Sequence, residues 1–436
     1  MLPRQNVLRC VWILFVLKCF ANSSYLHASP YIGSKSAYLH KDLVVLKEWG
    51  LLSSSVSAFP VPWRSVSRQL KTIDPSSLAP EPRLALLRLM HHLKMDEQMR
   101  STQIYKLNLF GEDSNVGAPL DAMSNKSNIQ LHTQTYFKGW YASLNTVTEF
   151  KGSTKILDSV LAYQSEYLNL RIGSFRQMWG PSNLNSLVLS SRDHSSNKIA
   201  VSSEGSSVDG SFISWIGDWY ASSQLVELEF GKNSQTALMN RFNFSPFYNV
   251  EFGISTVYLK DDIPSFSVDY FQSKVVLDSK FSAKLHSTPL SLYFQLSDTD
   301  ESLFGFASYI FNTRVSLEYG NSINVCAIVS LSEGCQIYNS NGFEETSLSF
   351  FSFNNYSAAS IDIPLEKGSS VKLELLNASD NLTFRREQDQ QSASYKRLTG
   401  SYQKPLGNWK IQVGIKLEEY DDFGSQAFAS VSYAVF

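Results

Sequence analysis

The feature that most constrains the fold is the strict alternation of apolar and polar residues in the later part of the chain. From Trp409 to Glu418 the two kinds alternate without a break, and a second alternating hairpin runs from Leu238 to Tyr258 around Ser245-Pro246. A period of two is that of a β-strand with one apolar face. Repeated strands of this kind are typical of a membrane β-barrel, apolar toward lipid and polar toward the lumen.

Composition supports the same interpretation. After the N-terminal region, no apolar segment approaches the roughly 18 residues of a transmembrane helix. Aromatic residues make up 13% and charged residues 18% of the chain, a balance that suits a barrel with aromatic girdles. A soluble β-sandwich or propeller would place charged residues on its outer faces, and no repeat of a propeller blade is visible. The net charge of −2 gives no sign of a nucleic-acid partner.

The first residues predict a secretory signal peptide. Arg4 and Arg9 flank the start of a short apolar run that ends at Leu17, and small residues allow cleavage after Ala21 or Ala28. We expect cleavage after Ala28, so that residues 1–28 are removed. Because an exported chain that forms a membrane β-barrel is typical of the outer membrane, we expect the protein to be located there.

Residues 29–125 are predicted to form a small α-helical bundle at the periplasmic mouth of the barrel. Apolar residues recur at helical spacing over 36–49, 64–70 and 82–99, and Gly50 ends the first helix. The polar stretch 111–127 is interpreted as a linker. The barrel is then expected over 128–436, long enough for about 16–20 strands of about 9–11 residues.

The stretch from Leu170 to Ser190 is the candidate binding site. Its ends alternate like strands, and an aromatic, polar loop lies between them. A Trp face stacks on the C–H surface of a sugar, while Arg, Gln and Asn match its hydroxyls. The alternative is a Gly-Pro turn with a structural Trp. The proposed contact residues are Arg176, Gln177, Trp179, Asn183 and Asn185.

Other polar residues are weaker candidates. Asp193 and His194 are added to the substrate-binding set, although they fit half of an acid-base pair or a loop salt bridge as well. Glu227 and Glu229 are expected to line the lumen. Cys326 and Cys335 remain after signal cleavage, and an even pair in an exported chain predicts one disulfide. We expect no catalytic residues, no metal and no cofactor.

The chain resembles the Wzi family of outer-membrane capsule assembly proteins. Asp42, Leu46 and Gly50 followed by Pro62-Trp63 match the family's opening helix and corner. The most specific match is Trp179-Gly180-Pro181, which leads into Ser-Leu-Val-Leu-Ser at 186–190, with Ser182 where the family has Gly. The stretches 239–255 and 292–301 are similar to a family hairpin and to its Tyr/Gln strand with an acidic loop.

This resemblance implies an all-β transmembrane barrel of about 18 antiparallel strands with a small N-terminal helical bundle. It also implies a non-enzymatic lectin that binds capsular or exopolysaccharide and assists its assembly and retention on the cell surface. A porin-like channel for small solutes and an outer-membrane hydrolase are the alternatives. We expect a monomer, with polysaccharide and outer-membrane lipid as its partners.

Overall fold

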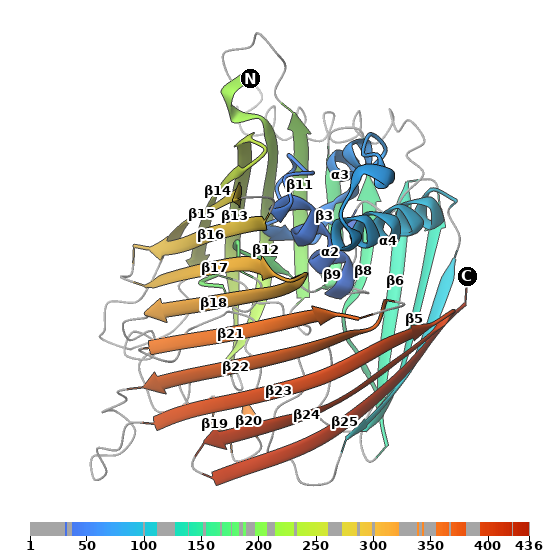
Figure 1. Cartoon of the computed structure of the whole chain (residues 1–436), viewed down its shortest axis with the longest axis vertical. Coiled ribbons are helices and arrows are strands. Elements are labelled where there is room, and N and C mark those ends of the chain that lie inside the picture. Colours follow the sequence, from blue (N-terminus) through green and yellow to red (C-terminus); the bar gives the residue numbers. More distant parts are fainter. Residues whose placement is uncertain are drawn as a thin grey trace, which may run out of the picture.

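A computed structural model of the chain contains a closed β-barrel with a helical region at one end (Figure 1). Every structural statement below concerns the residues that it describes. These are residues 31–32, 37–98, 101–110, 127–137, 139–150, 154–165, 168–175, 177–182, 186–188, 197–206, 214–230, 233–259, 273–285, 288–298, 301–321, 338–339, 342–343, 355–365, 368–380, 393–420 and 422–435.

The barrel wall is antiparallel throughout and closes where the last strand pairs with the first. Its strands are β4 (Thr102–Phe110), β5 (Asn128–Phe137), β6 (Trp140–Glu149), β7 (Thr154–Ile156), β8 (Ser159–Gln164), β9 (Asn169–Ser174), β11 (Asn197–Ser206), β12 (Asp218–Phe230), β13 (Asn233–Phe247), β14 (Val250–Leu259), β15 (Ser273–Leu285), β16 (Thr288–Ser297), β17 (Ser302–Ile310), β18 (Thr313–Asn321), β21 (Asn355–Pro364), β22 (Ser370–Asp380), β23 (Ala393–Leu406), β24 (Trp409–Tyr420) and β25 (Asp422–Val435).

The short strands β7 and β8 occupy a single position in this wall. Both pair with β6, and Asp158, with φ +53°, lies between them. The described wall therefore has eighteen strand positions. The predicted all-β barrel of about 18 strands is confirmed.

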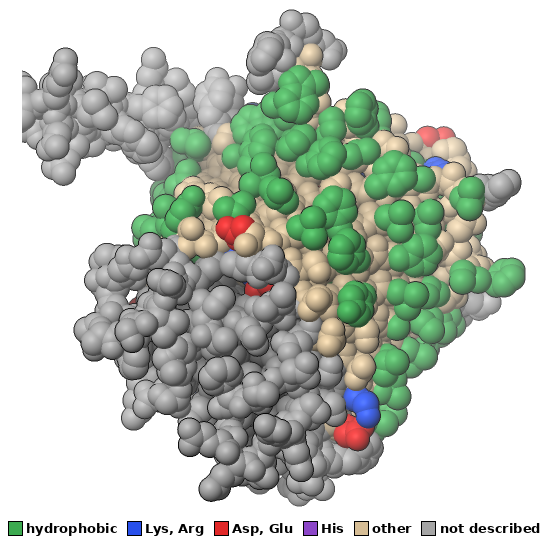
Figure 2. Space-filling view, turned by 90° about the vertical axis from the view of Figure 1, so that its left-hand side faces the viewer, with side chains coloured by type: hydrophobic (Ala, Val, Ile, Leu, Met, Phe, Trp, Pro, Cys, Tyr) green, Lys and Arg blue, Asp and Glu red, His purple; other side chains and the backbone are tan. Residues whose placement is uncertain are grey.

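The alternation seen in the sequence is an alternation between lipid and lumen. On β24, Val413 and Ile415 are exposed on the outer face, whereas Lys416 is 2% exposed on the inner face. Tyr105, Leu107 and further apolar side chains are exposed on the wall. On the face that Figure 2 shows, hydrophobic side chains are spread over the wall with few charged groups among them. Because a bilayer offers no hydrogen bonds, only a closed sheet of this kind satisfies every backbone group of the strands that cross it.

The N-terminal helical region, here called the plug (residues 31–97), packs at one end of the barrel (Figure 1). Its apolar core contains residues such as Leu46, Trp63 and Leu89. No described helix is long and apolar enough to cross a membrane. The plug consists of β1 (Tyr31–Ile32), α2 (Ala37–Glu48), β2 (Ala58–Phe59), β3 (Val61–Pro62), α3 (Trp63–Leu70), the 3₁₀ turn η1 (Pro75–Ser77) and α4 (Pro80–Glu97).

The plug lies at the end where neighbouring strands are joined by short turns. There Ile310 pairs with Thr313 and Leu406 with Trp409, whereas the connection from β18 to β21 at the other end is much longer. Short turns face the periplasm in barrels of this kind, and the long loops face outward. The periplasmic position of the helices stays a prediction.

The predicted domain boundary needs a correction, because the barrel begins at Thr102 and not at Asn128. β4 pairs with both β25 and β5, so the polar stretch predicted as a linker connects two barrel strands. The sequence analysis missed β4, because this strand directly follows a helix and is separated from the next strand by that polar stretch. The predicted signal peptide, residues 1–28, lies outside the described residues, as does the terminal Phe436.

We predict that Ile415→Arg destabilises the barrel by about 2–4 kcal/mol, because the side chain faces lipid near mid-bilayer. Ile415 lies six residues beyond Trp409, which is 50% exposed at the short-turn end. At a rise of about 3.3 Å per residue and a tilt of about 40°, that is about 15 Å into the membrane. Urea unfolding in lipid vesicles measures the effect.

The matched control is Gln412→Arg, which adds the same charge on the lumen face of the same strand. It should change the unfolding free energy little. Equal losses from both variants would contradict the assignment of the two faces.

Candidate functional site

The candidate site stretch folds into the lumen and lies across it. This segment, here called the inner loop (described residues 175, 177–182 and 186–188), leaves the wall after β9 and includes β10 (Met178–Trp179). β10 pairs with β2 of the plug, Met178 opposite Phe59. The backbone N–H of Gly180 donates to the carbonyl of Ser57 at 2.8 Å. The inner loop is therefore joined directly to the top of the plug.

The far side of the inner loop is held by Gln295 on β16. Its Nε2 donates to the carbonyl of Trp179 at 3.4 Å, and its Oε1 accepts from the N–H of Leu187 at 3.1 Å. Gly180 has φ +149°, and a Cβ there would lie 2.3 Å from this amide. Glycine is needed at this position both for the backbone conformation and for the close approach.

Glu318 on β18 forms a second attachment of the inner loop. Its buried carboxylate accepts hydrogen bonds from the hydroxyls of Ser182, Tyr293 at 2.5 Å and Tyr356 at 3.4 Å. A carboxylate with several donors is well solvated by the protein, so its burial is tolerated. The loop thus spans the lumen from β9 to the wall formed by β16, β18 and β21.

Trp179 is 1% exposed and packs in an apolar cluster inside the barrel with Leu187, Val188 and Tyr220. Its ring has no face open to a sugar in this arrangement, so the geometry favours the structural alternative for Trp179. Residues 187–188 are not in a strand, contrary to the prediction. Their apolar side chains are buried in the lumen and not in lipid, and alternation alone does not distinguish the two.

Of the remaining predicted residues, the structure describes Gln177 and Glu227, and most of the others lie outside the described ranges. Gln177 is fully buried, and within the described part of the chain neither atom of its amide group has a hydrogen-bond partner. Glu227 is exposed on the outer side of β12, opposite to the prediction, because the inward position is that of Val226. The residues outside the described ranges are Arg176, Asn183, Asn185, Asp193, His194, Cys326 and Cys335.

The opposite side of the plug is fixed to the barrel through Glu48, the last residue of α2. Arg314 donates to both of its carboxylate oxygens, at 3.0 and 2.8 Å, and Tyr309 donates at 2.9 Å. Lys280 lies 3.6 Å away. Burial opposes ionisation, but the charges of Arg314 and Lys280 outweigh it and lower the pKa of Glu48 to about 2.

Glu251 on β14 holds the plug at another point. It accepts from the hydroxyls of Ser55 and Ser57, and from the backbone N–H of Ser57 at 2.9 Å. Nearby, the ammonium of Lys47 donates to the carbonyl of Ser53 at 2.9 Å, and burial lowers the pKa of Lys47 to about 8. The contacts of Glu251 were not predicted, because they join residues 194–196 positions apart and no local pattern marks them.

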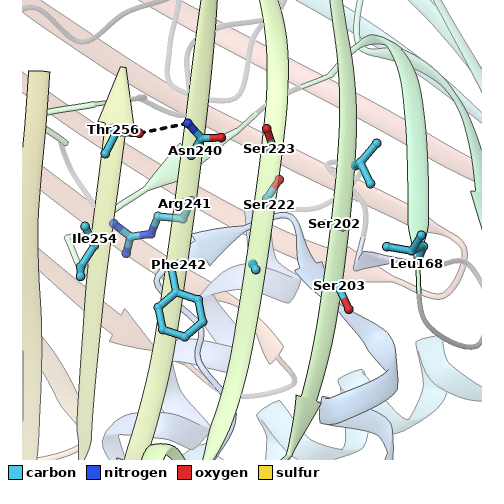
Figure 3. Close-up of a pocket in the computed structure, with 12 residues that line it drawn as sticks. Leu168, Ser202, Ser203, Ser222, Ser223, Asn240, Arg241, Phe242, Ile254 and Thr256 are labelled. Carbon is cyan, nitrogen blue, oxygen red and sulfur yellow. Dashed lines mark hydrogen bonds between the residues drawn. The ribbon is translucent and has the colours of Figure 1, made fainter. Parts of the chain in front are cut away.

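A groove of about 430 Å³ lies on the outer face of β11 to β14, as Figure 3 shows. Phe242 and Ile254 bound it, and small residues such as Ala221 lie at its floor. The amide of Asn240 donates to the Thr256 hydroxyl at 3.1 Å, which satisfies a polar group on the lipid side. The groove is separate from the lumen, into which the plug and the inner loop both fold.

Comparisons with known proteins agree with this architecture. The model of the family described as capsule assembly protein Wzi matches residues 114–259, which include the inner loop. The structure of Wzi, an outer membrane protein involved in group 1 capsule assembly in Escherichia coli and described as a carbohydrate-binding β-barrel, superimposes with a TM-score of 0.70 at 16% identity, over 91% of this chain and 97% of that one.

The structure of OccK8 (OprE) from Pseudomonas aeruginosa has a TM-score of 0.50 at 11% identity, over 77% of this chain and 97% of that one. No curated protein sequence matches the chain. The chain is thus a plugged β-barrel of the outer membrane. Its residues 114–259 match the Wzi family model, in line with the resemblance seen in the sequence.

We predict that Glu48→Gln loosens the plug. The substitution leaves the buried cations of Arg314 and Lys280 without their anion, which costs about 3–5 kcal/mol when a buried pair is broken. Ion current through single barrels in planar bilayers should show transient openings that the wild type lacks. Glu97→Gln is the control, because it removes an exposed pair with Lys71 and should leave the current unchanged.

The same contact predicts a pH dependence. Because the pKa of Glu48 lies below its usual value of 4.5, its stabilisation is complete above that pH and is lost as the pH falls toward about 2. Wild-type barrels should therefore begin to open across this range, whereas Glu48→Gln barrels should change less. An identical pH response in the two proteins would contradict this role of Glu48.

Proposed function

We propose that the protein is a non-enzymatic lectin of the outer membrane that binds capsular or exopolysaccharide and assists its assembly and retention on the cell surface. The observation that carries the proposal is the filling of the lumen by the plug and the inner loop, which are bonded to each other and to the wall. A barrel filled in this way is less suited to passing solutes than to holding a ligand. The match of residues 114–259 to a capsule assembly family supports the same function.

The contact residues are proposed to lie in the segment that the inner loop belongs to and in its continuation toward β11. Arg176, Gln177, Asn183 and Asn185 carry the donors and acceptors that sugar hydroxyls need, and Asp193-His194 follows them in the chain. Trp179 is proposed to anchor this segment, because its buried ring packs between plug and wall. Weak contacts suffice, since a long polymer engages many copies of the protein at once.

We predict that the triple variant Arg176→Ala, Asn183→Ala, Asn185→Ala lowers retained surface polysaccharide without lowering the amount of barrel. Each lost polar contact is worth about 0.5–1.5 kcal/mol, so binding should weaken by at least about tenfold. The measurement is polysaccharide binding to purified barrels together with capsule retention on cells. Unchanged binding would move the site to other loops, of which 298–301 is the next candidate.

We predict that Trp179→Ala opens the lumen, because removing a buried Trp side chain costs about 3–5 kcal/mol and frees the inner loop from the plug. Single-barrel conductance should rise. If the wild type itself conducts and binds no polysaccharide, the protein functions as a porin-like channel and the lectin proposal is wrong.

A further inference from the structure

Arg171 on β9 is a buried cation in an unusual environment. Its side chain points into the lumen and the residue is 2% exposed. The guanidinium carbon lies 4.1 Å from the ring centroid of Tyr31 in the plug and 4.6 Å from that of Phe175 at the start of the inner loop. It is therefore held between two aromatic rings at the junction of plug, wall and inner loop.

The stacking leaves the hydrogen-bond donors of Arg171 unused. Its Nε, Nη1 and Nη2 have no acceptor among the described residues. A guanidinium offers five N–H donors, and burying them without acceptors is costly. The buried amide of Gln177, two residues beyond Phe175, is likewise without a partner there. Unmet donors and acceptors at adjoining points of one segment indicate that a ligand supplies the missing partners.

A second cation lies close to Phe175. Lys198 on β11 lies 5.4 Å from the Phe175 ring and donates to the carbonyl of Phe175 at 2.8 Å. The carboxylate of Glu204 also lies near Tyr31, and its Oε2 accepts from the backbone N–H of Ser65 in the plug at 3.3 Å. Two cations therefore adjoin the start of the inner loop.

We propose that Arg171 binds the carboxylate of an acidic sugar in the polysaccharide that the barrel retains. A planar guanidinium matches a carboxylate with two parallel hydrogen bonds, and the flanking rings can pack against the sugar. Phe175 covers Arg171 from the side of the inner loop, so the sugar reaches it when Phe175 moves aside. This inference rests on the proposed lectin function and names the chemical class of its ligand.

The test compares the host's own surface polysaccharide with the same material after its carboxyl groups are reduced to alcohols. Both are titrated onto the purified full-length barrel in detergent. Wild type should bind the native polymer about tenfold more tightly than the reduced one, which is ~1.4 kcal/mol. Arg171→Met keeps an apolar chain between the two rings and should abolish this preference without weakening binding of the reduced polymer.

The control is Lys284→Met, which removes an exposed cation that lies 5.6 Å from the Trp49 ring and should leave the preference unchanged. Heat-modifiable migration in gels verifies that each variant is folded. If Arg171→Met keeps the preference, Arg171 only stacks and the inference is wrong. If millimolar inorganic phosphate removes the preference, the site takes any small anion and the inference is wrong as well.

The two proposals fail in different ways. Equal binding of both polymers by wild type and by Arg171→Met overturns the carboxylate site and leaves the lectin function intact. Binding of neither polymer by the wild type overturns both.

Discussion

The rest of the structure depends on the space that an eighteen-strand wall encloses. A barrel of this size is too wide for its own inward side chains to fill, and without further chain inside it would hold an aqueous channel. Here the plug and the inner loop occupy that space. Both bring backbone and apolar side chains such as Met178 and Trp179 into a lumen whose wall is polar, so every contact between them and the wall needs a defined hydrogen-bond partner.

Three buried carboxylates on or facing the wall supply those partners. Glu48 is bound by Arg314, Lys280 and Tyr309. Glu251 accepts hydrogen bonds from hydroxyl and backbone donors around Ser57, and Glu318 accepts them from hydroxyls of the inner loop and wall. Each carboxylate joins chain segments that are distant in sequence. Because a buried charge is strongly destabilising once its partners are lost, these contacts fix one position of the plug and loop more than they add to stability.

The strands of the barrel wall can be predicted from the sequence, whereas the contacts that hold the plug and the inner loop inside it cannot. Alternation identified the lipid face from residues such as Ile415, and helical spacing placed the plug helices within two residues of α2, α3 and α4. It missed β4, which stands alone between a helix and a polar stretch. It gave Glu227 the wrong face, because near the long loops the outer surface is no longer required to be apolar and the phase of the alternation becomes ambiguous.

The candidate site was harder to predict from the sequence than the wall. The pattern around Trp179 indicated an unusual loop, but residue type alone could not show whether its aromatic ring faces a ligand or the interior. The contact between Glu48 and Arg314 spans 266 positions and has no local signal. Periodicity reports which side of an element meets a nonpolar medium, whereas pairings across the lumen depend on the closed register of the barrel.

The filling of the lumen also bears on how such a barrel would serve a polymer. A lectin gains nothing from a conducting pore, and an open pore of this width would let solutes leak across the outer membrane. The contacts of Trp179, Gly180 and Gln295 fix the inner loop and so give the proposed binding segment a firm base. A site that is preorganised in this way loses less entropy on binding each sugar, which matters when single contacts are weak and many copies share one chain.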